Sequence, residues 1–392
     1  MKFLSSGESH GKALAGIIDD FPSGVNIDFS YINNELKRRQ SGYGRGKRMD
    51  IEKDSLEVLS GVRHGETIGS PISFLIYNKD WENWKEKMAV EFSDSKAENT
   101  NDLKILNPRP GHADFAGYTK YRLDDIRNVI ERSSARETAV RVAAGGFAKI
   151  LLKNFNIFVY SFVTQIGEIE LDFCDSYQEL NEDIYLRAEE SDLRCPDEKV
   201  TDNMKKEIDA AVKKGDTLGG KFVLFAKRIP VGLGSYSQWN RRLDAKIAHA
   251  IISIPAIKAV EIGNGVSSAK SSGINFHDEI FYSVEEGFYR KTNNAGGIEG
   301  GVTNGEDIII SAYMKPIPTT SAGLKTVNIK TKKNESSLKE RSDTCAVPSA
   351  SVVGEAMLAI VLADELQEKF GRDSLPEMLE NYKNYCKYMK NI

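Results

Sequence analysis

The protein is 392 residues long; 40% of its residues are hydrophobic and 28% are charged, which is typical of a soluble globular protein. No segment approaches the roughly 20 uninterrupted apolar residues that cross a bilayer, and polar GESHG at 7–11 stands where a signal peptide would be apolar. The net charge of −4 argues against nucleic-acid binding, because domains that bind nucleic acid are usually basic. We therefore expect a cytoplasmic protein that binds neither membranes nor nucleic acid.

Strand patterns recur along the whole chain. In chain order they predict strands at residues 56–61, 72–77, 157–165, 222–226, 259–262 and 308–314. The acidic segment 172–214 has a largely helical pattern and is expected at the periphery. Two polar stretches, about 84–104 and 325–340, lack apolar periodicity and are expected to be exposed loops.

Two further segments, 134–153 and 350–370, are predicted to be buried helices. Their apolar residues occupy every helical face and include many alanines and glycines, which favours burial all round and close packing. Strands outnumber clean strand–helix–strand units, so a doubly wound parallel sheet is not expected. The predicted fold class is α+β, with sheets packed over buried helices in a single domain that spans residues 1–392.

Two pairs of similar short segments in the sequence suggest internal duplication. GETIGS at 65–70 resembles GDTLGG at 215–220, and each precedes a predicted strand and then a buried helix. RSSA at 132–135 opens the first buried helix, and RSDTC at 341–345 stands before the second. The alternative is a chance similarity between glycine-rich turns.

Familiar nucleotide and metal motifs are missing. Neither Gly11-Lys12 nor Gly46-Lys47 is followed by Ser or Thr, which excludes a P-loop. GYGRGK at 42–47 has the wrong spacing for a dinucleotide-binding fingerprint. The four cysteines form no C-x-x-C pair, so we expect reduced thiols and neither a zinc site nor a disulfide framework.

Two of the five histidines are candidates for catalysis. His10 and His112 lie on turns without apolar neighbours, and imidazole titrates near neutrality and can pass a proton in either direction. His64 has a similar setting, which shows that the setting alone is a weak signal. His249 is expected on a helix surface and His277 in a loop.

Arginines give a stronger signal than the histidines. Residues 37–48 hold six cations and no acidic residue, and seven arginines of the chain lie in or beside Gly/Ser-rich turns. These are Arg39, Arg45, Arg48, Arg109, Arg132, Arg136 and Arg341. Guanidinium groups bind carboxylate and phosphate in bidentate fashion, so the set points to a small polyanionic ligand.

Three segments could form the walls of a cofactor pocket. RSS at 132–134 precedes a buried helix and offers hydroxyl groups at a helix N-terminus, where anions bind. The glycine-rich segment 293–301 would let its backbone approach a flat ligand closely. KPIPTT at 315–320 is a stiff turn with one cation and two hydroxyls.

Five motifs together resemble the chorismate synthase family. They are GESHG at 7–11, RRQSGYGRG at 38–46, RPGHAD at 109–114, ERSSARET at 131–138 and RSD at 341–343. The resemblance runs from Met1 to about Phe370. It implies a β-α-β sandwich of antiparallel sheets around buried helices, with internal pseudo-symmetry and usually a homotetramer.

The resemblance also implies a reaction. The family is a carbon–oxygen lyase that converts 5-enolpyruvylshikimate 3-phosphate to chorismate by 1,4-anti elimination of phosphate, in the shikimate pathway to aromatic amino acids. It requires reduced FMN without net redox change, and the flavin is thought to lend an electron and recover it. One phosphate and two carboxylates on the substrate would account for the many arginines.

Residue roles follow from the resemblance position by position. His10 would protonate reduced FMN, His112 would protonate the departing phosphate, and Asp343 would help flavin N5 to remove the C6 proton. Substrate contacts would fall on Arg39, Arg45, Arg48, Arg109 and Arg136. FMN contacts would fall on Arg132, Ser133, Ser134, Pro255, Ala256, Gly300, Lys315, Pro316, Ile317, Pro318, Thr319 and Arg341. Many members have Asn where this chain has Pro255, so a side-chain contact is lost there.

Several alternatives stay open at this stage. Arg39 and Arg45 match family positions assigned to NADP, although chemistry argues equally for substrate binding. No added domain is evident, so we expect an external flavin reductase, with NADPH as a possible source of reductant. A flavin-dependent oxidoreductase and a non-enzymatic anion- or RNA-binding module using residues 37–48 are the rival hypotheses.

Overall fold

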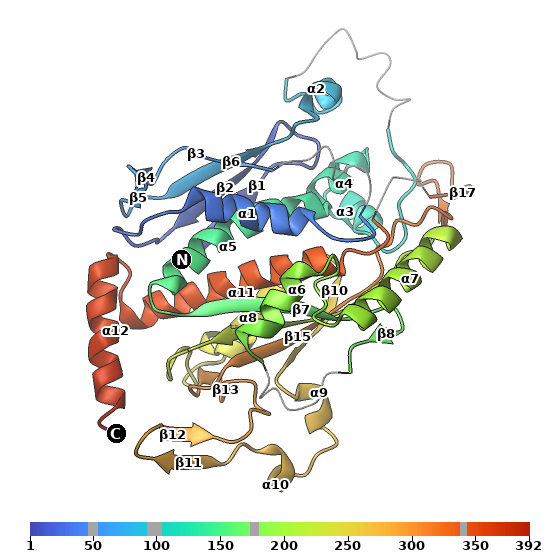
Figure 1. Cartoon of the computed structure of the whole chain (residues 1–392). Helices are drawn as coiled ribbons and strands as arrows, with labels where there is room; N and C mark the ends of the chain where they lie inside the picture. Colours follow the sequence, from blue (N-terminus) through green and yellow to red (C-terminus); the bar gives the residue numbers. More distant parts are fainter. Residues whose placement is uncertain (46–53, 92–103, 173–179, 338–342) are drawn as a thin grey trace.

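The computed structural model describes residues 1–45, 54–91, 104–172, 180–337 and 343–392. Two antiparallel sheets enclose a layer of long helices, with smaller helices and hairpins at the periphery (Figure 1). The predicted α+β class, with sheets around buried helices, is confirmed.

The first half of the chain builds the smaller sheet and its helices. Its strands are β1 (Lys2–Ser6), β2 (Ala13–Asp19), β3 (Leu56–Val58), β4 (Val62–Arg63), β5 (Glu66–Thr67) and β6 (Ile72–Tyr77). Its helices are α1 (Phe29–Gln40), α2 (Trp81–Trp84), α3 (Asp114–Lys120), α4 (Arg127–Ser133), the 3₁₀ turn η4 (Ala135–Glu137) and α5 (Thr138–Lys153).

The second half builds the larger sheet and the longest helix. Its strands are β7 (Phe158–Ile166), β8 (Ile169–Glu170), β9 (Gly220–Lys227), β10 (Ile257–Ile262), β11 (Ile280–Ser283), β12 (Gly287–Arg290), β13 (Ile298–Glu299), β14 (Val302–Thr303), β15 (Ile308–Met314), β16 (Lys325–Val327) and β17 (Asn334–Ser336). Its helices are α6 (Glu182–Glu190), α7 (Glu198–Lys214), the 3₁₀ turn η6 (Trp239–Arg241), α8 (Leu243–Ile252), α9 (Gly265–Ser268), α10 (Gly273–Phe276), α11 (Val347–Phe370) and α12 (Leu375–Met389).

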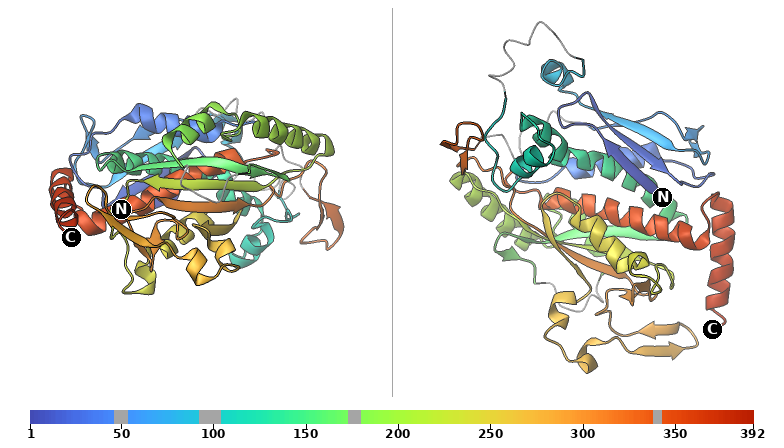
Figure 2. Two further views of the ribbon diagram at one scale, coloured as in Figure 1. Left: turned by 60° about the horizontal axis from the view of Figure 1, so that its bottom comes forward. Right: turned by 180° about the vertical axis from the view of Figure 1, so that it is seen from behind.

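The two halves repeat one arrangement. The first sheet has the order β1-β2-β6-β3 and the second β10-β15-β9-β7-β8. β6 and β9, which follow the two related glycine turns, each lie between two antiparallel neighbours. α5 packs against the first sheet and α11 against the second, so both helices lie between the two sheets (Figure 2, right). This repetition agrees with the internal duplication expected from the sequence.

Close contact between the two central helices explains their glycines and alanines. A Cβ added to Gly145 of α5 would lie 2.3 Å from the Cβ of Ala356 on α11, so only glycine permits this approach. α11 is the one described helix long and apolar enough to cross a bilayer, but 83% of its most apolar window is buried inside the protein. Its composition reflects a central position in the core.

A buried group of charges joins α1, α5 and α11. The carboxylate of Glu355 on α11 is fully buried and accepts hydrogen bonds from Arg38 on α1, from Lys149 on α5 and from Arg194. Glu35 forms further ion pairs with Arg38 and Lys149. Burial alone would raise the pKa of Glu355, but the neighbouring cations hold it far below its usual range. These ion pairs fix the register between helices from both halves.

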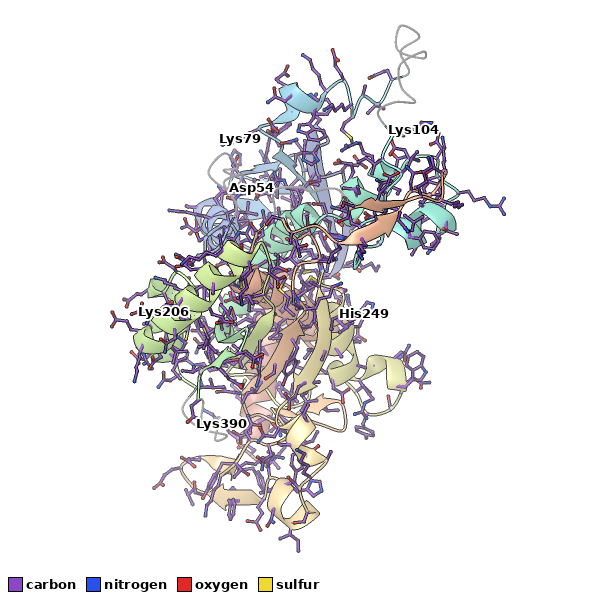
Figure 3. All side chains as sticks on the ribbon, turned by 90° about the vertical axis from the view of Figure 1, so that its right-hand side faces the viewer. Asp54, Lys79, Lys104, Lys206, His249 and Lys390 are labelled. Atoms are coloured by element: carbon purple, nitrogen blue, oxygen red, sulfur yellow. The ribbon has the colours of Figure 1, made fainter. Side chains whose placement is uncertain are left out.

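The peripheral segments differ in part from the sequence expectations. Of the predicted loop at 325–340, residues 325–337 are mostly exposed but form the hairpin β16–β17, and residues 338–340 lie outside the described residues. Of the predicted loop at 84–104, Trp84 ends α2 and residues 92–103 lie outside the described residues. α6 and α7 supply the predicted helices of the acidic segment. His249 is exposed on α8, as expected (Figure 3).

Strands β1 and β2 were not predicted, because polar and small residues interrupt their alternation. Cys195, Cys345 and Cys386 are free thiols, whereas Cys174 lies outside the described residues. Burial raises the pKa of the Cys345 thiol to about 12. Within the described ranges, no cluster of three or more His, Cys, Asp or Glu side chains is arranged to hold a metal ion.

Candidate active site

A cavity of about 560 Å³ lies where both central helices begin. Ser134, the N-cap of the turn η4, and Arg136 within this turn line it just before α5, and Thr138 lines it from the first residue of α5. Ala346 and Ser349 line it from the start of α11. The N-terminus of a helix carries partial positive charge, so two such ends at one cavity favour an anionic ligand.

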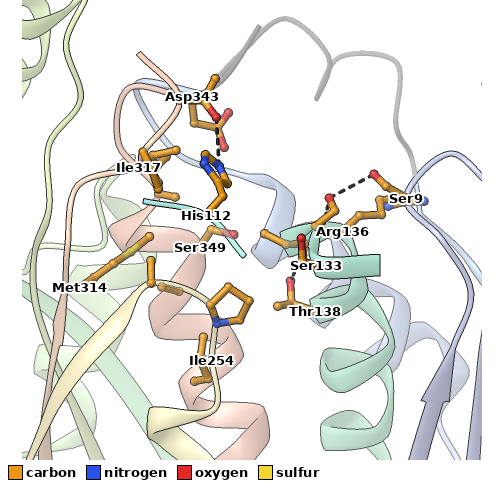
Figure 4. A pocket seen from close by; sticks show the side chains of 18 of the residues that line it. Ser9, His112, Ser133, Arg136, Thr138, Ile254, Met314, Ile317, Asp343 and Ser349 are labelled. Atoms are coloured by element: carbon orange, nitrogen blue, oxygen red, sulfur yellow. Dashed lines mark hydrogen bonds between the residues drawn. The ribbon is translucent and has the colours of Figure 1, made fainter. Parts of the chain in front are cut away.

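Residues from distant parts of the chain face each other across this cavity. In Figure 4, His112 and Asp343 lie on one side, opposite Ser133 and Arg136 on the other. Apolar side chains, including Ile254, Met314 and Ile317, form part of the wall. The lining therefore combines an apolar part with cations and hydroxyls.

The loop that carries His112 is held from both of its ends. Asp114, fully buried at the start of α3, accepts hydrogen bonds from Arg109 Nε at 2.8 Å and from the Arg109 backbone N–H at 2.9 Å. Lys315 Nζ donates to the carbonyl of Gly111 at 2.7 Å. Gly111 has a φ of +78°, and a Cβ there would lie 2.7 Å from Pro318 Cβ, so glycine is required for this close approach.

The imidazole of His112 is half-buried and contacts Thr319, with 3.2 Å between Nε2 and Oγ1. Burial lowers the pKa of His112, and the nearby cations Arg109 and Lys315 lower it further. Asp114 opposes this shift with a smaller effect. The imidazole is therefore mainly neutral in the ligand-free cavity at neutral pH and gains proton affinity when an anion binds beside it.

His10 is held by a buried carboxylate. Both oxygens of Glu131 lie 3.0 Å from His10 Nδ1, and Glu131 also accepts the His10 backbone N–H at 2.8 Å. Burial alone would raise the pKa of Glu131, but these hydrogen bonds and Arg127 bring it below its usual value. The Trp84 indole stacks on the His10 ring with 3.7 Å between ring centroids.

Arg39 and Arg136 share one carboxylate. Asp54, whose side chain is 1% exposed, accepts from Arg39 Nη2 at 2.8 Å and from Arg136 Nη1 at 2.6 Å. Burial lowers the pKa of the Arg39 guanidinium, which Asp54 partly offsets. Arg39 Nε is buried without a hydrogen-bond partner in the described structure, as expected at a site built for an anion.

Arg45 and Asp343 form an ion pair of 3.1 Å at the cavity wall. The backbone N–H of Thr344 donates to the carbonyl of Gly44 at 2.9 Å, which places the two loops side by side. Gly44 adopts a φ of +81°, so glycine allows the turn that brings Arg45 to Asp343. In the described part of the chain, Asp343 is the one carboxylate that lines the cavity.

Most of the predicted site residues meet in this one cavity. Those that line it are His10, Arg39, Arg45, Arg109, His112, Ser133, Ser134, Arg136, Pro255, Ala256, Lys315, Ile317, Pro318, Thr319 and Asp343. Arg48 and Arg341 lie outside the described residues. Arg132, Gly300 and Pro316 do not line it.

Two of the residues that do not line the cavity, Arg132 and Gly300, make contacts or lie elsewhere in the fold. Arg132 donates to the carbonyls of Ser5 and Gly7 and so anchors the loop that carries His10. Gly300 is exposed in the turn between β13 and β14. The glycine-rich segment before it packs against backbone: a Cβ at Gly296 would lie 2.4 Å from Gly263 N. It therefore does not form a wall of this cavity.

Sequence reasoning missed residues that support the site. Ser9 is buried and accepts a hydrogen bond from Ser134 at 3.1 Å, and Asp54, Trp84 and Glu131 hold cavity residues in place. Ser9 and Glu131 stand inside quoted motifs and could have been chosen there. Asp54 and Trp84 carry no comparable local signal.

Comparison with known proteins gives one consistent result. The sequence model of the chorismate synthase family matches residues 1–367. The chain is 54% identical over 387 residues to the chorismate synthase of Sulfurihydrogenibium sp. (strain YO3AOP1), covering 98% of each protein. It is 49% identical over 397 residues to that of Aquifex aeolicus (strain VF5), covering 100% of this chain and 99% of the relative.

Structural comparison agrees with the sequence comparison. A crystal structure of chorismate synthase superposes with a TM-score of 0.81 at 41% sequence identity, covering 100% of this chain and 98% of the other. With the family model and the relatives matching nearly the full length, the chain belongs to the chorismate synthase family and is a lyase.

Proposed function

We propose that the protein converts 5-enolpyruvylshikimate 3-phosphate to chorismate and phosphate by 1,4-anti elimination, within the shikimate pathway to aromatic amino acids. The observation that carries the proposal is the convergence of His10, His112, Asp343 and the cavity arginines on one space of about 560 Å³. Family membership supplies the reaction, and the cavity supplies groups of the chemical types that the reaction needs.

The charge of the cavity suits this substrate. Five cations line it, namely Arg39, Arg45, Arg109, Arg136 and Lys315. They outnumber the three carboxylates that pair with them, Asp54, Asp114 and Asp343. The excess of cations leaves the cavity positively charged, which favours an anionic ligand such as one with a phosphate and two carboxylates.

The cavity also fits a reduced flavin. Its volume lies within the range of roughly 300–1,000 Å³ that is usual for cofactor sites. Pro255, Ala256 and Ile317 offer apolar contact to a flat ring, and Ser133, Lys315 and Thr319 offer polar contact. When bound, reduced FMN supplies an electron that weakens the carbon–oxygen bond to phosphate and is then recovered.

The chain's own residues handle protons. His112 would donate to the leaving phosphate oxygen, because the phosphate's charge raises the proton affinity of the adjacent imidazole. Asp343 would assist removal of the C6 proton. His10 would supply the proton that keeps the reduced cofactor in its working protonation state.

Arg39 and Arg45 are proposed as substrate ligands. Both line the same cavity as the two catalytic histidines, so an anion bound there reaches them directly. This placement favours substrate binding over a separate NADP site. We further propose that an external flavin reductase, with NADPH as one source of electrons, reduces the flavin, and that the reaction takes place in the cytoplasm.

A homotetramer is proposed for the assembly. Leu4 and Ile17 are paired neighbours on the outer face of the first sheet, and they are 71% and 45% exposed. Association of copies through this face would cover apolar surface. Light scattering should give a mass of four chains for the wild type and a smaller mass for Ile17→Lys.

The experiment that tests the reaction follows both products. Under anaerobic conditions with an excess of reduced FMN, we expect chorismate and phosphate to appear in equal amounts from 5-enolpyruvylshikimate 3-phosphate. His112→Ala should lose turnover while still binding FMN. Phosphate release without chorismate, or no product from protein that binds FMN, would refute the proposed reaction.

A further inference from the structure

His10 lies between two residues, Glu131 and Trp84, to which the proposed reaction assigns no role. On one side the buried carboxylate of Glu131 contacts Nδ1 with both oxygens at 3.0 Å. On the other side the indole of Trp84 lies over the imidazole, with 22° between the ring planes. Trp84 is itself held by a hydrogen bond of 3.0 Å from its Nε1 to Asp80.

The Glu131 contact selects one form of the imidazole. Because the Glu131 side chain is 1% exposed and ionised, it can only accept from His10, so Nδ1 carries a proton. Nε2 is then the ring nitrogen that can exchange a proton with a bound molecule. His10 lines the cavity and its side chain is 15% exposed, so one edge of the ring remains accessible.

Trp84 restricts the ring's orientation. An imidazole that is hydrogen-bonded at one nitrogen can still tilt about that bond, and a stacked indole removes this freedom. Stacking on an aromatic face also stabilises a protonated ring through its quadrupole. Charged groups near this stack include Asp80, which accepts the indole N–H, and Arg127 and Lys87, which lie over the indole. Arg127 also lies 3.4 Å from Glu131.

We propose that Glu131 and Trp84 are positioning residues for His10, fixing its tautomer and its plane so that Nε2 exchanges the proton at the cavity. The functional consequence rests on the lyase reaction proposed above. The arrangement itself is tested without flavin or substrate, so failure of one claim is distinguishable from failure of the other.

Trp84 provides the probe, because a protonated imidazole in contact with an indole quenches its fluorescence. Trp81→Phe and Trp239→Phe together leave Trp84 as the only tryptophan, since the chain has three. In this flavin-free background we expect weaker emission in acid, where the imidazole is protonated, than in alkali, where it is neutral. His10→Asn should abolish the transition, and His112→Asn, the matched control, should keep it.

Glu131→Gln removes the negative charge beside the ring. The midpoint of the transition should then move to lower pH by roughly one unit, because loss of a nearby anion disfavours the protonated imidazole. If that variant does not fold, Arg127→Gln is the second test and should move the midpoint to higher pH. The proposal would be overturned if emission did not change with pH, or if the transition were still present in His10→Asn. It would also be overturned if the folded variants had the same midpoint as the protein with Glu131 and Arg127 intact.

Turnover gives the second readout. Trp84→Leu and Glu131→Gln should lower kcat by roughly 10-fold or more, since positioned acid–base groups contribute about 10²–10⁴-fold, with the substrate KM little changed. Trp84→Phe should restore most of kcat, because a smaller ring can still stack. Trp81→Leu on the same short helix is the control and should retain wild-type kcat. A rise in KM alone would contradict a positioning role for His10.

Discussion

At the scale of single residues, each of the four arginines that line the cavity is oriented by a carboxylate. Asp54 holds Arg39 and Arg136, Asp114 holds Arg109, and Asp343 holds Arg45. Such pairing keeps guanidinium groups ordered before a ligand arrives, so less entropy is lost on binding. The arrangement predicts that single arginines control substrate affinity.

Arg45→Ala should raise the substrate KM by roughly 10-fold or more, the usual effect of removing one charge-assisted hydrogen bond. The FMN dissociation constant, measured by flavin fluorescence, should change much less. Arg187→Ala, an exposed arginine on α6, is the control and should leave both constants unchanged. A larger effect on FMN than on substrate would assign Arg45 to the cofactor.

His112 should produce a characteristic pH dependence. Burial, Arg109 and Lys315 lower the pKa of His112 in the free enzyme. His112 therefore loses its proton at a lower pH than an ordinary histidine does. Because kcat/KM reports the free enzyme, its alkaline limb should lie below the ordinary histidine pKa. The limb of kcat should lie at higher pH, because bound phosphate favours the protonated ring. Coincident limbs in the two profiles would argue against His112 as the phosphate's acid.

At the scale of elements, the site depends on the register of α1, α5 and α11. Arg38 and Arg39 are adjacent on α1: Arg38 pairs with buried Glu355, whereas Arg39 lines the cavity. Ser349 on α11 donates to the Arg39 carbonyl at 2.6 Å. A shift between these helices would therefore displace an active-site arginine.

Glu355→Gln should destabilise the protein by about 3–5 kcal/mol at neutral pH, because it leaves three buried cations without their shared anion. Urea unfolding measures this. Glu368→Gln, whose exposed carboxylate pairs with Arg372 on the surface, should cost less than about 1 kcal/mol.

The pH dependence of this difference has a definite sign. The folded-state pKa of Glu355 is depressed, so its contribution is complete above its unfolded value of 4.5 and is lost as pH falls below it. The difference in free energy of unfolding between wild type and Glu355→Gln should therefore become smaller in acid. Equal stability of the Glu355 and Glu368 variants at neutral pH would contradict this account.

At the scale of the whole molecule, the sequence predicted those elements and site residues that are marked by a local residue pattern. The buried helices α5 and α11 were predicted because apolar residues occupy all their faces, and strand β15 because it is rich in isoleucine and other apolar residues. His10 and His112 were identified from the motifs that contain them. β1 and β2 escaped prediction, since their polar and small residues are stabilised by pairing with each other and with β6.

The supporting residues of the site could not be predicted for a different reason. Asp54 contacts Arg136, 82 positions away, and Trp84 at the end of α2 stacks on His10, which follows β1. Such contacts depend on how distant segments of the first half fold together, and no local pattern of residues encodes them. The placement of the glycine-rich segment outside the cavity likewise reflects tertiary packing against Gly263.

The central claim is that the cavity performs an elimination without net oxidation or reduction. The most direct test supplies photoreduced FMN in catalytic amount, without oxygen, together with excess 5-enolpyruvylshikimate 3-phosphate, and counts chorismate per flavin. We predict many turnovers per reduced flavin, with the flavin still reduced at the end. Product that stops at one equivalent of reduced flavin would contradict the account and indicate an oxidoreductase.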